Sequence, residues 1–317
     1  MPQVSVVIPT FNRAHFLAAA VRSVMCQTFQ DFELLIVDDG GSDLTPAIVE
    51  SFRDERLRYI RHSAQRGGAA ARNTGIVHSS GEYVAFLDDD DEWYPEKLAR
   101  QMDLMLHAQA QVGGVYTGYL IVNRNSGSLC GQIIPRKTGK LYRSLLAGNC
   151  IGGTSSVLLR RACLERAGLF DEQLPSFQDY DLWIRIARLF EFESIAEPLL
   201  KYFVHGDQVW TNLDALTEGL EIMLRKHGSS RAFRKKSSSY YVSFGVRFCE
   251  NNDLKSGRKA FLRAAVLYPY RFQPYLYACF ALLGPSKFDK ARNVKTKLLE
   301  RFRNSHSVQN LSKSCLK

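Results

Sequence analysis

Four consecutive aspartates, Asp88 to Asp91, stand at the end of an apolar run. The run Glu82–Leu87 is β-branched, aromatic and apolar, which predicts a buried strand. Adjacent carboxylates repel one another, and a divalent cation relieves that repulsion. Oxygen ligands suit Mg²⁺ or Mn²⁺, which binds through one or two carboxylates while substrate phosphates complete its coordination. The alternative is a solvated acidic loop that caps a helix before Pro95, because aspartate is favoured at such positions.

Two further polar clusters follow apolar runs earlier in the chain. Val4–Ile8 leads into Pro9-Thr-Phe-Asn12, and Glu33–Val37 ends at Asp38 and Asp39. The length and composition of both runs predict buried strands. In open α/β sheets, ligands bind beyond the carboxyl ends of the strands. The three clusters together therefore favour a metal and nucleotide site over a solvated acidic loop.

Helices and a further strand are predicted between these clusters. Arg13–Gln27 has apolar residues at helical spacing, Leu57–Ile60 is strand-like, and the alanine-rich segment Gly67–Val77 suits a helix packed closely on a sheet. Strands that alternate with helices at this spacing predict a parallel, doubly wound α/β sheet. No GxGxxG motif follows the first strand and no Walker lysine motif is present, so we expect the metal to hold the phosphates.

Four motifs of the chain occur in the order of one known family. They read VSVVIPTFNR, QTFQDFELLIVDDGGSDLT, GGAAARNTGI and GEYVAFLDDDDEW. Over residues 1–212 the chain thus resembles the family 2 glycosyltransferases. The resemblance implies the GT-A fold, a Rossmann-like α/β fold with a mixed sheet. It also implies transfer of a sugar from a nucleotide-sugar donor, with inversion at the anomeric carbon.

The resemblance also implies donor-binding residues. Asp39 would accept a hydrogen bond from the nucleotide base, which suits the N3–H of uracil or thymine. Asp88-x-Asp90 corresponds to the family's DxD motif, with Asp90 on the metal and Asp88 or Asp89 at the ribose. The other implied donor-binding residues are Pro9, Thr10 and Asn12 at the base, and Arg72 and Asn73 at the base or phosphate.

Some of these assignments have open alternatives. Pro9 can also be interpreted as a strand terminator, and Arg72 as the surface charge of an alanine-rich helix. Gly41 stands where serine is commoner in the family. The thickening of the DxD motif to four aspartates blurs the role of each carboxylate.

The segment Ser176–Arg185 predicts an amphipathic helix with Asp179 and Asp181 in its first turn. Carboxylates there interact favourably with the helix dipole, and capping is our interpretation of Asp181. The family has an acidic pair at this position, usually Glu-Asp, whose Asp is the catalytic base. The pair here is Gln178-Asp179, so the resemblance implies that Asp179 is the base. A neutral neighbour should lower its pKa relative to a Glu-Asp pair.

His205 follows the predicted strand Leu199–Val204. A lone histidine is usually structural, but this one matches the family's histidine after the last strand. Because imidazole is an ordinary metal ligand, His205 is a candidate contact to the metal or the diphosphate. The other histidines, including His62, have no such context. The predicted cofactor is Mn²⁺ or Mg²⁺.

The C-terminal part differs in charge from the rest. Residues 1–214 carry 21 Lys and Arg against 26 Asp and Glu, whereas residues 215–317 carry 21 against 6. Residues 213–317 are predicted to form a basic, mainly helical region, in which Gly228–Ser239 is a linker and Phe288–Phe302 a late helix. Basic residues interleaved with aromatics suit an anionic membrane surface; the alternative is a solvated appendage. No nucleic-acid-binding module is visible.

The opening of the chain does not resemble a signal peptide, and no apolar stretch reaches the ~20 residues of a membrane span. Seven cysteines without CxxC spacing favour reduced thiols over a disulfide framework or a zinc site. These features predict a cytoplasmic protein, peripheral on the inner face of the cell membrane.

The combined prediction is an inverting, metal-dependent glycosyltransferase of the hexosyltransferase type, which acts in cell-surface polysaccharide synthesis. UDP- or dTDP-sugars are favoured as donors, and the acceptor is a glycan or a lipid-linked glycan. One alternative is a non-catalytic nucleotide-sugar-binding scaffold. Another is a metal-dependent phosphohydrolase, which would need two metal ions about 4 Å apart.

Overall fold

The computed structural model describes residues 1–206, 211–282 and 284. The chain divides into two compact units. Within the described residues, the first unit holds Met1–Leu145 and Asn149–Gly206, and the second holds Leu146–Gly148 and the residues from 211 onward. The structural division thus falls at Gly206, slightly before the predicted boundary after residue 212.

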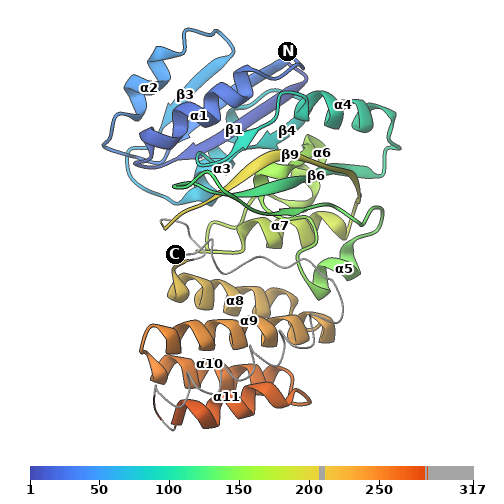
Figure 1. Ribbon diagram of the computed structural model, residues 1–317. Helices are drawn as coiled ribbons and strands as arrows, with labels where there is room; N and C mark the ends of the chain where they lie inside the picture. The colour runs from blue at the N-terminus through green and yellow to red at the C-terminus, as the bar shows by residue number, and fades with distance from the viewer. Residues whose placement is uncertain (207–210, 283, 285–317) are drawn as a thin grey trace. The chain divides into compact units, whose positions relative to one another are not determined.

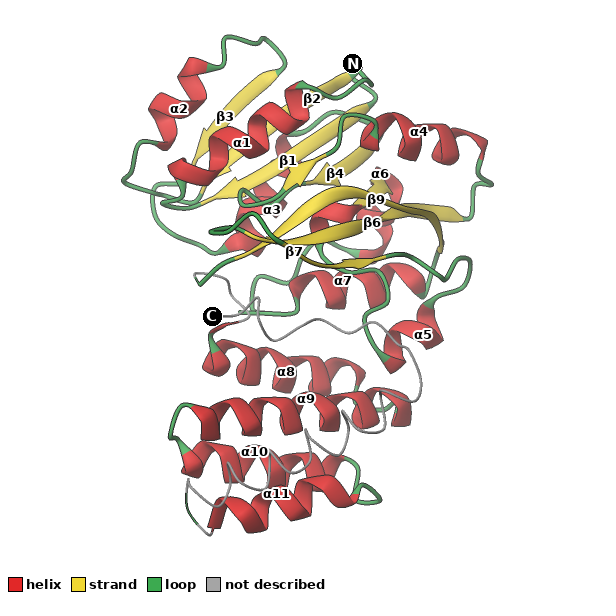
Figure 2. Cartoon of the chain, in the orientation of Figure 1, coloured by secondary structure: helices red, strands yellow, loops and turns green. Residues whose placement is uncertain are grey.

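The first unit is built on one mixed sheet, shown in Figure 2. Strands β1 to β4 are parallel to one another in the order β3-β2-β1-β4. Their bounds are Val4–Thr10 for β1, Phe32–Asp38 for β2, Leu57–Arg61 for β3 and Tyr83–Phe86 for β4. This part confirms the parallel arrangement predicted from the alternation of strands and helices.

The rest of the sheet departs from the parallel prediction. Strand β8 (Val157–Arg160) lies antiparallel to β4, and β6 (Val112–Asn123) lies antiparallel to β8. Strand β9 (Glu191–Val204) is parallel to β6, and β5 (Glu92–Trp93) is antiparallel to β9. Strand β7 (Leu129–Ile133) forms a hairpin with β6. The mixed sheet implied by the family resemblance is therefore the one that forms.

Helices cover both faces of the parallel part. Val6, Ile8, Leu34 and Ile36 belong to a buried cluster that includes Leu17 of α1. On the opposite face α3 approaches β1 so closely that a Cβ atom at Gly75 would lie 2.3 Å from Val7 Cγ1. Burial on both faces explains why these strands are continuous apolar runs rather than alternating ones. The helices of this unit are α1 (Ala14–Met25), α2 (Thr45–Ser51), α3 (Gly68–His78), α4 (Lys97–His107), α5 (Tyr142–Ala147), α6 (Arg161–Ala167) and α7 (Gln178–Ala187), with a 3₁₀ turn at Thr154–Ser156.

Strand β1 continues through Pro9 to Thr10, so Pro9 does not terminate it. Pro9 pairs with Val37 of β2 but lies beyond Val7, the last residue of β1 paired with β4. A strand tolerates the missing N–H of proline where one side has no neighbouring strand. The strand therefore carries Thr10 to the edge of the sheet where the polar clusters gather.

The described part of the second unit is helical. It contains α8 (Leu213–His227), α9 (Arg231–Glu250), α10 (Leu254–Leu267) and α11 (Phe272–Leu282), which follow one another as a stack in Figure 1. Glu221 of α8 ties three helices together, because it accepts hydrogen bonds from Tyr241 of α9 at 2.6 Å and from Arg263 of α10 at 2.7 and 2.8 Å. The predicted helix Phe288–Phe302 lies outside the described residues.

The predicted linker Gly228–Ser239 is wrong, because α9 begins at Arg231. Ser230 caps the helix by accepting from the Phe233 N–H at 3.3 Å. The serines that made the segment look like a linker pack against α10: Ser237 and Ser238 are fully buried, and Ser238 Oγ donates to the Ala264 carbonyl at 2.8 Å. Small side chains here allow two helices to approach closely, a role that composition alone does not distinguish from a linker.

Each helix in residues 1–206 and 211–282 is too short or too polar to cross a lipid bilayer. The free thiols among the described cysteines are Cys26, Cys150, Cys163, Cys249 and Cys279.

Candidate active site

The four aspartates follow β4 in a tight, buried turn. The Asp91 N–H donates to the Asp88 carbonyl at 3.0 Å. Asp89, Asp90 and Asp91 are only 4%, 6% and 1% exposed. Helix α4 begins well beyond them, and its N-cap position is Glu96. These residues are therefore neither a solvated loop nor a helix cap, and their burial requires compensation for their charge.

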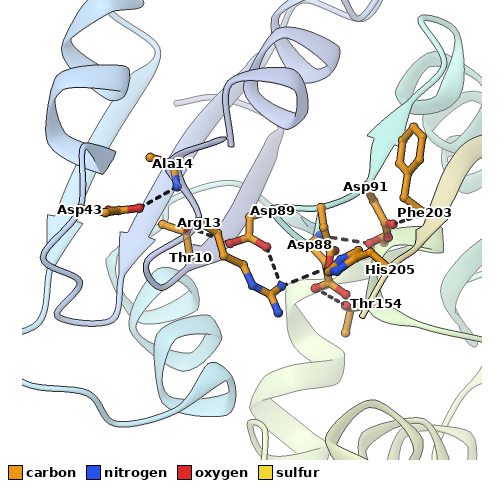
Figure 3. A network of polar contacts seen from close by, with 12 residues as sticks. Thr10, Arg13, Ala14, Asp43, Asp88, Asp89, Asp91, Thr154, Phe203 and His205 are labelled. Carbon is orange, nitrogen blue, oxygen red and sulfur yellow. Dashed lines mark hydrogen bonds and ion pairs between the residues drawn. The ribbon is translucent and has the colours of Figure 1, made fainter. Parts of the chain in front are cut away.

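The end of β1 supplies part of that compensation, as Figure 3 shows. Thr10 Oγ1 donates to Asp89 Oδ2 at 2.7 Å. The Arg13 guanidinium donates to Asp89 Oδ1 at 3.2 Å and to Asp90 Oδ2 at 3.1 Å. Two clusters that lie more than 70 residues apart in sequence thus meet at one edge of the sheet.

The end of β9 reaches the same place. His205 Nε2 lies 2.8 Å from Asp90 Oδ2, and the Phe203 N–H donates to Asp91 Oδ1 at 3.2 Å. The two predicted metal ligands are therefore neighbours. Adjacent ligands of an octahedral cation with bond lengths of 2.0–2.1 Å are about 3 Å apart, so this carboxylate and imidazole fit one small divalent ion.

The remaining ligands of such an ion would not come from a protein cage. No cluster of three or more His, Cys, Asp or Glu side chains placed to hold a metal occurs in the part of the chain that the structure describes. A site with few protein ligands is typical of Mg²⁺ and Mn²⁺ bound together with substrate phosphates. The donor set therefore fits a cation whose coordination is completed by a diphosphate and water.

Two of the four aspartates have a raised pKa. Burial and the neighbouring charge of Asp90 raise the pKa of Asp89 to about 7, although Arg13 and Thr10 act in the opposite direction. Burial, followed by Asp90 and Asp88, raises the pKa of Asp91 well above its usual range. Asp91 Oδ2 is buried and has no hydrogen-bond partner among the described residues. Burial and the charge of neighbouring aspartates thus both oppose the ionisation of Asp89 and Asp91.

Arg72 connects the aspartate turn to the start of α7. Its Nη2 donates to Asp88 Oδ1 at 2.6 Å, and its Nη1 donates to Gln178 Oε1 at 3.3 Å. Thr154 Oγ1 donates to the same Asp88 oxygen at 3.0 Å. The Arg72 side chain is only 13% exposed, so it is not the surface charge that one interpretation of the sequence suggested.

Asp179 lies beside this connection, in the first turn of α7 as predicted. Its Oδ1 accepts from the Tyr180 N–H at 2.7 Å. Burial raises the pKa of Asp179 to about 6, while the Tyr180 N–H and the charge of Arg72 limit the rise. The residue before the helix, Phe177, has a left-handed backbone with φ of 61°, a conformation that costs energy and is frequent near functional sites.

Asp181 lies in the first turn of α7, as expected for a capping residue, and it makes a further contact there. Asp181 is fully buried, and its Oδ2 accepts from Arg185 Nε at 2.8 Å. Arg185 also donates to backbone carbonyls of the segment that follows α6, including that of Leu169 at 2.7 Å. Asp181 therefore orients an arginine that fixes this loop, which distinguishes it from Asp179.

Asp39 lies at the end of β2 in a network of donors. Its Oδ1 accepts from the Arg66 N–H at 2.9 Å and lies 2.7 Å from His62 Nδ1, and its Oδ2 accepts from the Gly67 N–H at 2.6 Å. His62 Nε2 in turn lies 2.9 Å from Thr74 Oγ1. A carboxylate has about four acceptor positions, so one remains for a further donor.

The loops after β1 and β2 hold each other in place. Asn12 has a left-handed φ of 53°, and its Oδ1 accepts from the Ser42 N–H at 2.7 Å. A Cβ atom at Gly41 would lie 2.9 Å from Asp38 Oδ1 and 3.0 Å from Asn12 Oδ1. Glycine in place of the commoner serine therefore permits this close approach of the two loops.

Asn73 is directed elsewhere. Its Nδ2 donates to the Phe170 carbonyl at 3.0 Å and to Glu172 Oε1 at 2.9 Å, while its Oδ1 accepts from the Phe170 N–H at 3.0 Å. The structure thus links Asn73 to the loop before α7 rather than to the aspartates, and its role in donor binding stays a prediction. Pro9, buried within β1, also makes no polar side-chain contact to them.

Sequence reasoning missed Arg13, His62 and Thr154. Arg13 directly follows the Asn12 motif at the end of a predicted strand, and this position is a signal that could have marked it as a site residue, although it does not identify the aspartates as its partners. His62 and Thr154 carry no local signal, because their partners are remote in sequence. Their contacts follow from the pairing of strands and not from any motif.

The chain is similar to proteins of one known family. Residues 5–166 match the family model described as Glycosyl transferase family 2. The chain is 36% identical over 186 residues to the Escherichia coli protein WfgD, a UDP-Glc:alpha-D-GlcNAc-diphosphoundecaprenol beta-1,3-glucosyltransferase, covering 58% of this chain and 70% of WfgD. It is 32% identical over 264 residues, 76% of this chain, to an uncharacterized glycosyltransferase of Rickettsia bellii, and spans 37% of that relative's length.

Solved structures show the same fold. S. aureus TarS 1–349 in complex with UDP-GlcNAc has a TM-score of 0.63 at 16% identity, covering 97% of this chain and 93% of TarS 1–349. The mannosyltransferase PcManGT of Pyrobaculum calidifontis, in complex with GDP-Man and Mn²⁺, has a TM-score of 0.58 at 21% identity, covering 89% and 80%. These likenesses confirm the predicted GT-A fold.

The raised pKa of Asp179 predicts an effect on stability. The folded-state pKa is about 6 and the unfolded value is near 3.9, so ionisation of this group costs folding free energy as the pH rises through that range. Asn removes the cost and keeps an oxygen for the Tyr180 N–H. We expect Asp179→Asn to raise the free energy of unfolding at pH 7 by about 1–3 kcal/mol, at about 1.4 kcal/mol per pKa unit.

Urea unfolding of both proteins at pH 7 and pH 4 measures this effect. The gain should be much smaller at pH 4, where the folded-state carboxyl is protonated. A loss of stability at pH 7, or an equal gain at both pH values, would show that ionisation of Asp179 is not strained by burial.

Proposed function

The chain belongs to glycosyl transferase family 2, and from this premise we propose that it is an inverting, metal-dependent glycosyltransferase that uses a nucleotide-sugar. We favour UDP- or dTDP-sugars as donors and a glycan or lipid-linked glycan of cell-surface polysaccharide as acceptor. WfgD, a glucosyltransferase that uses UDP-Glc and a diphosphoundecaprenol-linked acceptor, supports both choices. The expected location is the cytoplasm, peripheral on the inner face of the cell membrane.

The observation that carries this proposal is the bridge made by Arg72. One buried guanidinium contacts both Asp88 of the aspartate turn and Gln178, the residue next to Asp179. A donor diphosphate held at the aspartates would thus lie close to the first turn of α7. Transfer requires this proximity, because base, acceptor oxygen and anomeric carbon must meet within contact distance.

Asp179 is the proposed general base. It would take the proton from an acceptor hydroxyl while that oxygen forms a bond to the anomeric carbon and the bond from that carbon to the diphosphate breaks. A carboxyl with a pKa of about 6 is mostly ionised at neutral pH and is a stronger base than an ordinary aspartate. A single base suffices, in contrast to glycosidases, which use two flanking carboxylates.

Asp90 and His205 would hold the Mn²⁺ or Mg²⁺ ion, and Asp88 or Asp89 would contact the ribose. When bound, the cation supplies positive charge that offsets the charge developing on the departing diphosphate. The bound Mn²⁺ and GDP-Man of PcManGT are compatible with such an arrangement. The raised pKa of Asp89 and Asp91 gives independent support, since the cluster lacks positive charge.

Asp39 is the proposed acceptor for the nucleotide base, at its one unused acceptor position. Because a carboxylate requires a donor on the base, uracil or thymine N3–H is the expected partner. Thr10 and Asn12 belong to the adjoining loop, and Arg72 is positioned for phosphate. Pro9 and Asn73 would contribute to the donor pocket mainly by shaping the backbone of β1 and of the loop near Phe170.

The second unit is proposed to bind an anionic membrane surface. Residues 211–282 carry 12 Lys and Arg against 5 Asp and Glu. On α11 the side chains of Phe272 and Leu276 are exposed one turn apart, and on α10 Leu262 and Val266 are exposed one turn apart. Exposed apolar side chains on a unit with an excess of basic residues suit insertion between anionic headgroups.

The base assignment predicts that Asp179→Asn lowers turnover by about 10²–10⁴-fold, the usual contribution of a general base, while donor affinity changes little. Wild-type turnover should also fall below about pH 6, where Asp179 becomes protonated. Incubation with Mn²⁺ and a panel of UDP-, dTDP- and GDP-sugars, with and without acceptor glycans, measures both. Asp181→Asn is not a suitable control, because the Asp181 side chain has a structural role. Glu197→Gln is the control, because Glu197 is exposed.

Retention of more than about a tenth of wild-type turnover by Asp179→Asn would assign the base elsewhere. If the protein binds the donor but shows neither sugar transfer nor slow donor hydrolysis under any of these conditions, the non-catalytic scaffold would be favoured.

The metal assignment predicts that Asp90→Ala weakens the Mn²⁺-dependent part of UDP binding by at least about tenfold, since a charge-assisted contact is worth about 1.5–3 kcal/mol. Calorimetry with UDP in the presence and absence of Mn²⁺ gives this part by difference. Asp103→Ala, an exposed aspartate of α4, is the control. Undiminished Mn²⁺-dependent binding in Asp90→Ala would rule out this ligand.

The membrane proposal predicts that the double variant Phe272→Ser/Leu276→Ser binds anionic vesicles at least about tenfold more weakly, since burying one large apolar side chain contributes about 1.5–3 kcal/mol. Binding of the wild type should also decrease as salt rises, because each basic residue near the surface contributes about 1 kcal/mol before screening. Co-sedimentation across a salt series measures both, with Leu106→Ser, exposed on α4, as the control. Equal pelleting with neutral and anionic vesicles, or none with either, would refute the proposal.

A further inference from the structure

Arg13 lies between the end of β1 and the start of α1, with its side chain directed at the aspartate turn (Figure 3). One nitrogen, Nη1, donates to both Asp89 Oδ1 and Asp90 Oδ2, at 3.2 and 3.1 Å. The carbonyl of Arg13 accepts from the Phe16 and Leu17 N–H groups at 2.9 and 3.2 Å. The backbone is thus anchored to the first turn of α1, while the long side chain has several rotatable bonds.

Among the described residues, Arg13 and His205 both contact Asp90 Oδ2. This oxygen accepts from Arg13, and it lies 2.8 Å from His205 Nε2. In the proposed function this same carboxylate holds the divalent cation. A cation on Asp90 Oδ2 would meet the Arg13 guanidinium within contact distance, and two positive charges in a poorly solvated place repel strongly. The guanidinium and the cation therefore cannot both use this oxygen in the arrangement seen here.

We propose that Arg13 is an internal counter-ion for Asp89 and Asp90, which a divalent cation must displace in order to bind. The inference rests on the proposed metal site and adds a competitor to it. In the absence of cation, Arg13 neutralises two buried carboxylates that would otherwise be poorly compensated. Cation binding then requires the guanidinium to leave, so the affinity for the cation alone is weak.

The competition gives the donor a part in metal binding. A nucleotide diphosphate brings further oxygen ligands for the cation and negative charge for a displaced guanidinium. The diphosphate and the cation should therefore bind together more favourably than either alone, and binding coupled in this way is reciprocal. The protein would hold little free Mn²⁺ and would assemble its metal site only with a donor present.

The test is a titration of the full chain with Mn²⁺ at pH 8 without nucleotide. Electron paramagnetic resonance measures the free Mn²⁺ at each point of the titration. We expect Arg13→Gln, which removes the charge, to bind Mn²⁺ at least tenfold more tightly than the wild type. Arg13→Lys keeps a charge and should remain within about threefold of the wild type. Arg22→Gln, an exposed arginine of α1, is the control for net charge and should not differ.

A second readout does not depend on the metal assay. Arg13→Gln should have a lower Tm than the wild type in chelator, since it leaves two carboxylates uncompensated, and saturating Mn²⁺ should raise its Tm by more than it raises that of the wild type. Circular dichroism establishes that each variant is folded.

The inference would be overturned if Arg13→Gln bound Mn²⁺ without nucleotide no more tightly than the wild type, or if Arg13→Lys gained as much affinity as Arg13→Gln. The same titration with UDP separates it from the proposed function. If the protein binds Mn²⁺ in the presence of UDP, but Arg13→Gln gains no Mn²⁺ affinity over the wild type, only the counter-ion role of Arg13 is refuted. No Mn²⁺ binding by any variant, with or without UDP, refutes the metal site and the counter-ion together.

Discussion

The concentration of buried carboxylates at one edge of the sheet is the constraint on which the rest of the site depends. Asp89, Asp90 and Asp91 are almost inaccessible to water, and a buried charge is tolerated only when it is paired or neutralised. The protein supplies cations and donors from distant segments: Arg13 from the loop after β1, and His205 from the end of β9. The pKa of Asp91 nevertheless remains strongly raised. The site is thus built with a deficit of positive charge, which a divalent cation can fill.

The directions of the strands bring these groups to the aspartates. Strand β9 runs in the same direction as β4, because β8 is antiparallel to β4, β6 is antiparallel to β8, and β9 is parallel to β6. Its carboxyl end therefore lies at the same edge as the aspartate turn and places His205 beside Asp90. Antiparallel β8 begins at this edge, and the 3₁₀ turn before it supplies Thr154, which donates to Asp88. The edge thus receives polar groups both from strands that end there and from a strand that begins there.

The sequence permitted the strands and their polar ends to be predicted, but not the partners of those ends. Runs such as Val4–Ile8 and Glu33–Val37 are apolar throughout because both faces of the sheet are covered, and this signal is local. The pairing of His62 with Asp39, or of Arg13 with Asp90, depends on strand order and loop path, which no short motif encodes. The linker prediction for the serine-rich start of α9 was wrong for the opposite reason. The local composition is typical of a linker, but the segment forms a helix that packs closely on α10. Asp181 was likewise assigned from its position in a first turn, although its buried ion pair with Arg185 decides its role.

The environment of Asp179 shows how the charge deficit and the proposed chemistry are related. Burial raises the pKa of this carboxyl to about 6, and Arg72 restrains the rise. A glutamate in place of Gln178 would add a like charge next to Asp179 and would compete for Arg72, which here donates to both Gln178 and Asp88. With a neutral amide, Arg72 serves the aspartate turn and the first turn of α7 at once. The proposed base, Asp179, therefore lies near the same arginine that compensates Asp88, and this arginine limits the rise of the Asp179 pKa. A change in charge at the aspartate turn should for this reason alter the proton affinity of Asp179.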